Sequence, residues 1–250
     1  LIDTHCHLAQ ADYDQDRAQL LTRCQQDMRA VITCCAHPKD FSLTMQLVTQ
    51  HPGLVFASAS IHPQYITLSD QDIAKYMREI RANRTNLVAI GETGLDYNWV
   101  TDRPGQTRQK HMFQQFIQVA QELQLPLVIH SRDSTEDVVE ILEAHKLTDV
   151  QMHMFTKRPL LQRVISNGWL ISVNTLLLRS KTVKKIVRDC PLEQLLLETD
   201  APWLGIGADG NIKSKYEVRN EPLAVQRVAD KIAEIKRMEP LEVVVQTGKN

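Results

Sequence analysis

The chain has 250 residues, 43% of them hydrophobic and 24% charged, a composition typical of a folded globular protein. The formal net charge of −1 excludes a strongly basic surface and argues against tight, unassisted binding to a long duplex, but not against brief contact with a nucleic acid end. No apolar run approaches the length of a membrane span, no signal-peptide pattern occurs, and the five cysteines are irregularly spaced without a C-x-x-C motif. We therefore predict a cytoplasmic protein without a disulfide framework or a zinc knuckle.

Short apolar runs alternate along the chain with longer segments of helical period. The predicted strands are Leu1–Asp3, Ala30–Cys34, Leu54–Ser58, Leu87–Ile90, Leu127–Ile129, Val150–Met152, Leu170–Val173 and Leu195–Leu197. Eight strands separated by helices predict an α/β fold of the parallel (β/α)8 barrel type, formed by residues 1–250 as one domain. A doubly wound open sheet is the alternative, but no G-x-G-x-x-G motif follows any of the strands.

Two of the helical segments carry particularly clear signals. The segment "RQKHMFQQFIQVAQEL" (108–123) repeats apolar residues at helical spacing, which predicts an amphipathic helix. In "STEDVVEILEAH" (134–145), Ser134 is followed three residues later by Asp137, and this acidic first turn predicts a helix start.

His5 and His7 follow the first apolar run in "LIDTHCHLAQ", with Asp3 just before them. Side chains two residues apart on a strand point to the same face, so both imidazoles are expected to lie on the same side of the strand and to point towards the same site. Cys6 points to the other face, where core packing is the simpler interpretation. Two ordinary histidines near the N-terminus would also explain the pair, so partners must come from elsewhere in the chain.

Most of the predicted strands end in residues that bind metals. The carboxyl ends of barrel strands meet on one rim, where residues distant in sequence converge. The resulting candidate ligand set is His5, His7, Glu92, His130, His153 and Asp200. A salt-bridged or hydrogen-bonded rim residue would explain each of them singly. Four imidazoles and two carboxylates together exceed one closed zinc site and suit two divalent ions with open positions.

Two such ions favour hydrolysis of a phosphodiester by activated water. Glu92 is the candidate for the carboxylate between the ions, and Asp200 could both bind one ion and accept the proton of the nucleophile. Arg132 suits bidentate binding of a phosphate, although a salt bridge to a neighbouring acid is equally compatible. His62, before Pro63, could bind phosphate, support the site, or be purely structural.

The remaining histidines and the main basic cluster have simpler interpretations. His51, His111 and His145 suit surface or helix-end positions, whereas His37 stays undecided because it follows a strand on the same rim. The segment "RSKTVKKIVR" (179–188) suits a solvated helix face, and next to the rim it could instead guide a polyanion.

With these residues assigned, the chain resembles the TatD family of metal-dependent hydrolases nearly end to end. The matching motifs are "DTHCHL" (3–8), "IHP" (61–63), "AIGETGLDY" (89–97), "LPLVIHSRD" (125–133), "HMF" (153–155), "LLLETDAPWL" (195–204) and "RNEP" (219–222). The resemblance implies a TIM barrel of the metallo-dependent hydrolase type. It also implies that His5 and His7 bind one ion, completed by Asp200, that His130 and His153 bind the other, and that Glu92 bridges them.

The resemblance, and nothing in composition or periodicity, suggests DNA as the substrate. The best-known members of the family are deoxyribonucleases, some of which trim DNA from the 3′ end with magnesium or another divalent ion. Three departures affect this expectation: Ser60 replaces the usual Gly before "IHP", Lys157 replaces a usual Gly after Thr156, and the chain ends at "QTGKN" before the usual closing helix residues.

We therefore predict a deoxyribonuclease of the 3′-5′ exonuclease type that uses two divalent ions (Mg²⁺, Mn²⁺ or Zn²⁺) and needs no obligate protein partner. One alternative is an amidohydrolase-like enzyme that acts on a cyclic amide, a lactone or a small phosphoester. Many of those relatives bridge their metals with a modified lysine after the fourth strand, where this chain has Glu92. The other alternative is a non-catalytic scaffold that binds metal.

Overall fold

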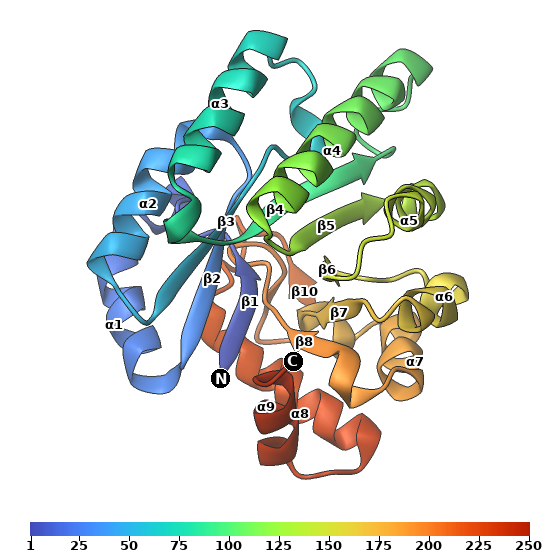
Figure 1. The fold of residues 1–250 in the computed structure, drawn as a ribbon. Coiled ribbons are helices and arrows are strands. Elements are labelled where there is room, and N and C mark those ends of the chain that lie inside the picture. The colour runs from blue at the N-terminus through green and yellow to red at the C-terminus, as the bar shows by residue number, and fades with distance from the viewer.

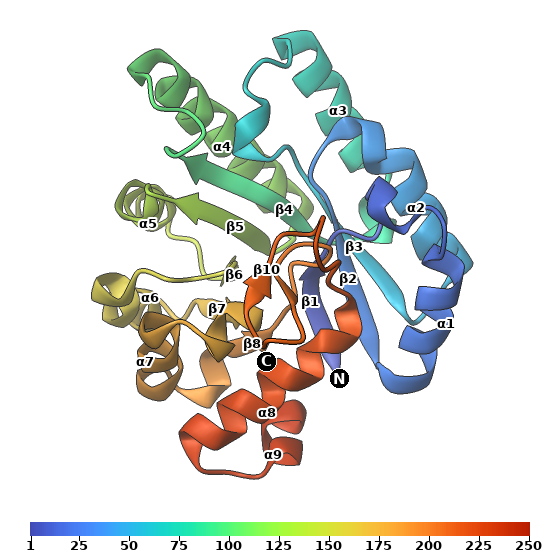
Figure 2. The same ribbon diagram turned by 180° about the vertical axis from the view of Figure 1, so that it is seen from behind.

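The strands pair in chain order into one parallel eight-stranded barrel, which confirms the predicted fold (Figures 1 and 2). The computed structural model describes residues 1–250. The barrel strands are β1 (Ile2–Cys6), β2 (Ala30–Cys35), β3 (Val55–Ala59), β4 (Leu87–Asp96), β5 (Leu127–Arg132), β6 (Val150–Met152), β7 (Leu170–Val173) and β8 (Leu195–Leu197).

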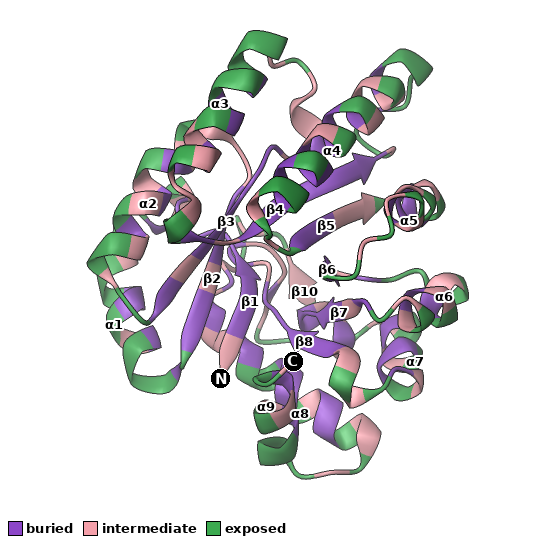
Figure 3. Cartoon of the chain, in the orientation of Figure 1, coloured by how far each residue is buried: buried purple, intermediate pink, exposed green.

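Helices surround the barrel, and they bury their apolar faces against the strands while their outer faces meet solvent (Figure 3). They are α1 (Arg17–Asp27), α2 (Phe41–Gln50), α3 (Asp70–Ala82), α4 (Arg103–Leu123), α5 (Thr135–Ala144), α6 (Leu161–Ser166), α7 (Lys181–Asp189), α8 (Val225–Lys236) and α9 (Pro240–Thr247). In α4 the predicted apolar stripe is buried throughout. No helix combines the length and the apolar character that crossing a membrane requires.

The barrel closes between β8 and β1 through hydrogen bonds at the carboxyl ends of these strands. The backbone N–H of Asp200 donates to the carbonyl of His5 (2.9 Å), and the N–H of His7 donates to the carbonyl of Ala201 (2.7 Å). The buried carboxylate of Asp3 accepts from the N–H (3.0 Å) and hydroxyl (2.6 Å) of Thr199. The seam thus fixes the segment that carries Asp200 against the one that carries the two N-terminal histidines. A small hairpin of β9 (Gly205–Ile206) and β10 (Ile212–Lys213) follows β8.

Five strands extend further than predicted: β1 to Cys6, β4 to Asp96 and β5 to Arg132 by three or more residues, and β2 to Cys35 and β3 to Ala59 by one. The prediction ended each of them where its apolar run ended. Parallel pairing continues through the polar residues, as in the register Gly94↔His130 and Asp96↔Arg132. Several candidate site residues therefore lie within strands rather than in loops, and the barrel backbone holds them.

The start of α5 was predicted correctly, but not through a capping box. The Ser134 hydroxyl donates to the carbonyl of Leu95 (2.8 Å) instead of capping the helix. Asp137 accepts from Tyr97 and pairs with Lys110 (2.7 Å). Tertiary hydrogen bonds to β4 and α4 thus replace the local ones that the sequence pattern indicated.

Candidate metal centre

The six candidate ligands converge at the carboxyl end of the barrel. His5 lies near the carboxyl end of β1, and His7 directly follows that strand. Glu92 lies in β4 and His130 in β5. His153 directly follows β6, and Asp200 follows β8. A cavity of about 310 Å³ opens there, and five of the six line it, whereas His5 lies beneath them and is 1% exposed. The predicted clustering of six residues from five strands is therefore present.

One group of ligand atoms comes from the seam of the barrel and comprises His5, His7 and Asp200. The Nε2 atoms of the two histidines are 3.2 Å apart, and Asp200 Oδ1 lies 3.7 Å and 3.3 Å from those of His5 and His7. The Nδ1 atoms of both rings are buried without a hydrogen-bond partner. We refer to these three residues as the seam group.

A second group comprises Glu92, His130 and His153 on the neighbouring strands. Glu92 Oε1 lies 2.6 Å from His130 Nδ1 and 3.6 Å from His153 Nε2. The far nitrogens of both histidines are hydrogen-bonded to buried carboxylates, Nε2 of His130 to Asp96 (2.8 Å) and Nδ1 of His153 to Glu198 (2.8 Å). We refer to these three residues as the anchored group.

Glu92 faces both groups, one with each oxygen. Whereas Oε1 faces the anchored group, Oε2 lies 3.5 Å from His5 Nε2 and 3.8 Å from His7 Nε2. The Glu92 side chain is buried, and the Cys34 thiol accepts its backbone N–H at 3.1 Å. One carboxylate is thus held where it can serve two adjacent sets of ligands.

The donor set fits divalent metal ions. An ion bound at about 2.0–2.1 Å holds neighbouring ligand atoms about 2.9 Å apart in octahedral and about 3.4 Å apart in tetrahedral coordination. The seam group has separations of 3.2, 3.3 and 3.7 Å between its ligand atoms. Buried imidazole nitrogens this close to one another, with carboxylates beside them, satisfy their lone pairs best on a shared cation.

Two buried carboxylates, Asp96 and Glu198, were missed as site residues by the sequence interpretation. Each accepts from a ring nitrogen of a candidate ligand and so fixes that ring's orientation and tautomer. Glu198 also accepts from Ser172, Asn174 and the Met154 backbone. The sequence contained a signal for Glu198, because it directly follows the apolar run Leu195–Leu197, much as Glu92 follows the run Leu87–Ile90. A carboxylate beside a buried strand needs hydrogen-bond partners.

Burial and mutual contacts shift the pKa values of these groups in opposite directions. Burial lowers the pKa of His5, and nearby His153 lowers it further. Burial also disfavours the charged form of His153, but the carboxylates of Glu198 and Glu92 outweigh burial and raise its pKa to about 10. Burial raises the pKa of Glu92, yet the adjacent histidines outweigh it, so that its pKa lies well below the ordinary range and the carboxylate is ionised.

His62 lies beside the anchored group and presents an N–H to it. Its Nδ1 accepts the backbone N–H of Gln64 (3.1 Å), so in the neutral ring the proton is on Nε2. That nitrogen lies 3.3 Å from His130 Nδ1 and 3.7 Å from Glu92 Oε1. Burial, with His130 nearby, lowers the pKa of His62 to about 3, so the ring is a neutral donor at neutral pH. This chemistry suits an anion better than a metal ion.

Arg132 lines the same cavity and forms no ion pair with Asp133, Glu136 or any other acid. Its guanidinium is exposed, whereas its backbone is held in β5. The salt-bridge interpretation is therefore wrong, and the cation faces the cavity region without a protein counter-ion.

The other histidines lie outside the metal centre, as expected for His51, His111 and His145. His51 and His145 cap the carboxyl ends of α2 and α5. His37, which the sequence left undecided, packs against the lining residue Tyr65 and accepts from the N–H of Lys39, but does not itself line the cavity. From Lys181 onwards the basic segment 179–188 lies in α7, and its lysines are exposed or half-buried. Lys157 is exposed and does not line the cavity. Ser60 is buried, and its hydroxyl has no hydrogen-bond partner.

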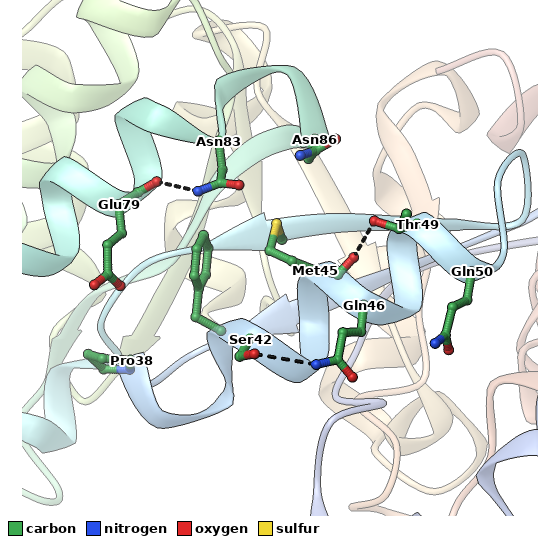
Figure 4. A pocket seen from close by; sticks show the side chains of 10 residues that line it. Pro38, Ser42, Met45, Gln46, Thr49, Gln50, Glu79, Asn83 and Asn86 are labelled. Carbon is green, nitrogen blue, oxygen red and sulfur yellow. Dashed lines mark hydrogen bonds between the residues drawn. The ribbon is translucent and has the colours of Figure 1, made fainter.

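A larger groove on the outside of the barrel lacks the chemistry of the metal centre. It lies between α2 and α3 and measures about 660 Å³ (Figure 4). Amides and hydroxyls dominate its lining, with Glu79 as the only carboxylate and no histidine. Size therefore does not identify the functional site here, whereas the convergence of titratable groups does.

Comparisons with known proteins agree with this geometry. The family model described as "TatD related DNase" matches residues 2–250. The chain is 33% identical over 262 residues to the uncharacterized metal-dependent hydrolase YabD of Bacillus subtilis (strain 168), with 100% of this chain and 96% of that one covered. It is 30% identical over 263 residues to the Homo sapiens protein named deoxyribonuclease TATDN3, with 100% and 92% covered. The solved structure of YJJV, a TatD homolog from Escherichia coli K12, has the same fold with a TM-score of 0.89 at 24% identity, with 100% and 95% covered.

Proposed function

The chain belongs to the TatD family of metal-dependent hydrolases, and on that premise we propose that it is a deoxyribonuclease that uses two divalent ions, Mg²⁺, Mn²⁺ or Zn²⁺, to hydrolyse phosphodiesters from the 3′ end of DNA. Family membership makes the chain an enzyme, a metal-dependent hydrolase that acts on ester bonds. The substrate, the polarity, the number of ions and the residue roles are the proposal.

The observation that carries the proposal is the position of Glu92. Its Oε2 lies 3.5 Å from a nitrogen of the seam group and its Oε1 lies 3.6 Å from a nitrogen of the anchored group. A carboxylate shared in this way would serve two neighbouring ions, one held by the seam group and the other by the anchored group. Bound ions of this kind supply Lewis acidity towards water and towards the oxygens of a phosphodiester.

The chain's own residues have distinct roles in the proposed reaction. Asp200 accepts the proton of the attacking water, because its carboxylate is ionised and lies in the cavity. Arg132 binds a phosphate oxygen with its unpaired guanidinium, and His62 donates its Nε2–H to the same phosphate. The hydrogen bond from the Gln64 backbone fixes the His62 ring before the substrate arrives, whereas of Arg132 only the backbone is held, in β5.

The test uses metal-stripped protein and a single-stranded DNA oligonucleotide labelled so that loss of 3′ nucleotides is visible. Mg²⁺, Mn²⁺ or Zn²⁺ is added back to the wild-type chain, to Asp200→Asn, and to Asp27→Asn as a control with the same change at an exposed position. We expect stepwise shortening that needs metal, persists in the control and is lost in Asp200→Asn. Equal inactivity of wild type and Asp200→Asn with metal bound would refute the nuclease proposal and turn the search to cyclic amides, lactones and small phosphoesters.

A further inference from the structure

Two aromatic rings stand exposed near the mouth of the metal-centre cavity. The large hydrophobic side chains exposed on this protein are Trp99 (64%), Tyr216 (88%), Leu241 (71%) and Val245 (46%). Leu241 and Val245 belong to α9, outside the cavity lining. Trp99 lines the cavity, and the ammonium of Lys215 lies close both to the ring of Tyr216 and to that of Trp203, which also lines the cavity. Exposed aromatic rings around the opening of a cavity indicate a surface that binds a ligand.

Both rings are tied to the metal centre by charged groups. The Asp96 carboxylate that holds His130 through Oδ2 accepts the backbone N–H of Trp99 through Oδ1 (2.9 Å). Lys215 Nζ lies 5.5 Å from the ring of Tyr216 and 5.1 Å from that of Trp203, and it pairs with Asp12 at 2.8 Å. Trp203 in turn contacts His7 edge-on, with ring centroids 4.8 Å apart. Trp99 is thus connected to the candidate ligand His130 through Asp96, and Tyr216 to the candidate ligand His7 through Lys215 and Trp203.

The rings come from opposite sides of the barrel. Trp99 follows β4, and Tyr216 belongs to the segment after β8, which carries β9 and β10 (Figure 2). Strands 4 and 8 are four apart in an eight-stranded barrel paired in chain order, so they face each other across it. A linear ligand whose centre is at the metal ions can therefore extend towards one ring on each side.

The cations near the rings favour an anionic ligand that also has flat apolar groups. Arg132, without an ion pair, lines the cavity together with Trp99, whereas the ammonium of Lys215, which adjoins Tyr216, is already paired with Asp12. Cations beside exposed aromatic rings are the combination that binds single-stranded nucleic acid, because the cations contact phosphates and the rings stack on bases. A simple phosphoester has no base to cover the rings, and the bases of a duplex are already stacked.

We propose that Trp99 and Tyr216 are base-stacking residues that select an unpaired nucleic acid strand, one on each side of the scissile phosphodiester. This inference rests on the proposed phosphodiesterase function. It adds the residues that distinguish an unpaired strand from a duplex and from a small phosphoester.

The test compares kcat/KM for two single-stranded oligomers of equal length, one of thymidylate and one of abasic tetrahydrofuran nucleotides. We expect Trp99→Ala and Tyr216→Ala each to lower kcat/KM for the thymidylate strand by about tenfold, through KM, and to change the value for the abasic strand far less. Trp99→Phe keeps a ring and restores most of the loss. Leu241→Ala and Val245→Ala, which remove exposed apolar side chains from α9 away from the cavity, leave both values unchanged.

A spectroscopic readout separates ring contact from a merely structural role. The thymidylate strand is expected to quench tryptophan emission of the wild-type chain, and Trp99→Phe to lose most of this quenching while it keeps its KM. Equal kcat/KM for the two strands in the wild type, or a Trp99→Ala effect no larger than that of Leu241→Ala, would overturn the stacking proposal and leave the nuclease proposal standing. If the wild type cleaves neither strand, the proposed function fails and the stacking proposal fails with it.

Discussion

The two ligand groups of the metal centre are held in place by different parts of the molecule. In the seam group, backbone hydrogen bonds between the ends of β1 and β8 set the relative positions of His5, His7 and Asp200, and no side chain forms a hydrogen bond with Nδ1 of either ring. In the anchored group, Asp96 and Glu198 hold His130 and His153 by side-chain hydrogen bonds. The seam group therefore depends on closure of the barrel, whereas the anchored group depends on two buried carboxylates.

The difference also sets the charge of the metal-free histidines. Burial keeps His5 neutral by lowering its pKa, because no carboxylate contacts its far nitrogen. Burial acts in the same direction on His153, but its carboxylate partners raise the pKa to about 10. We infer that an ion meets a deprotonated His5 in the seam group and a protonated His153 in the anchored group, so the two ions should respond differently to mutation and to pH.

The largest effect is expected from Glu92→Gln, which removes the carboxylate that the two groups share. Activity should fall by roughly 10³-fold or more, since both ions lose a ligand at once. The measurement is kcat/KM on the oligonucleotide together with the number of metal ions bound per chain. Glu193→Gln, the same change at an exposed position, is the control. Retention of two tightly bound ions and of activity in Glu92→Gln would show that the carboxylate is not shared.

Glu198→Gln should weaken the ion of the anchored group selectively. Loss of the carboxylate that orients and polarises His153 is expected to lower affinity for that ion by about 10–100-fold, while the ion of the seam group is retained. Calorimetric titration of metal into stripped protein resolves the two events, and Asp96→Asn tests the same effect through His130. An equal weakening of both ions by Glu198→Gln would contradict the division into two groups.

The affinity of the anchored group for metal should depend on pH. His153 has a pKa of about 10 in the metal-free protein, above the ordinary value of 6.5, so an ion must displace a proton at any pH below 10. Affinity should therefore rise with pH, by about tenfold per unit for each proton displaced, whereas the seam group shows a weaker trend. Titration in buffers of different ionisation enthalpy counts the released protons, and binding without proton release between pH 7 and 9 would contradict the prediction.

The same shift has a consequence for stability. The raised pKa of His153 stabilises the metal-free fold. The full contribution is present below pH 6.5, and it is lost as the pH rises towards 10. The melting temperature of stripped protein should therefore fall over this range.

The smallest effect is expected from Asp3→Asn, which acts on the seam itself. Asp3 accepts hydrogen bonds from the His5 and Thr199 backbones and from the Thr199 hydroxyl, and an amide cannot accept all of them. We expect a loss of about 1–3 kcal/mol in the free energy of unfolding, with weaker metal binding in the seam group and no change in the anchored group. Urea unfolding measures the first and metal titration the second. Unchanged stability would mean that Asp3 does not hold the seam.

The fold could be predicted because the period of apolar residues survives in the linear chain. Eight apolar runs separated by amphipathic segments have few arrangements other than a barrel, and the pairing of β1 to β8 in chain order confirms it. Membership of the TatD family, and with it the assignment as a hydrolase, was likewise predicted from motifs and is confirmed. The roles of the individual ligands, the number of ions and the DNA substrate stay predictions.

Strand ends and hydrogen-bond partners could not be obtained in this way. Polar residues after an apolar run are equally compatible with a loop and with a paired strand, so β4 was ended at Ile90 instead of Asp96. The partners of Ser134 and Asp137 lie on other elements, and nothing local in the sequence distinguishes a cap from a tertiary hydrogen bond.

The sequence by itself determined which side chains reach the carboxyl end of the barrel. Side chains two residues apart on a strand point to the same face, and the carboxyl ends of all parallel strands lie at the same end of the barrel. Only the tertiary structure decided how those side chains are shared and oriented. Which oxygen of Glu92 faces which histidine, which carboxylate holds His130 or His153, and which nitrogen of His62 carries its proton depend on contacts within a few ångströms between strands far apart in the chain. Periodicity carries no information about such distances, since hydrogen bonding and coordination change over tenths of an ångström.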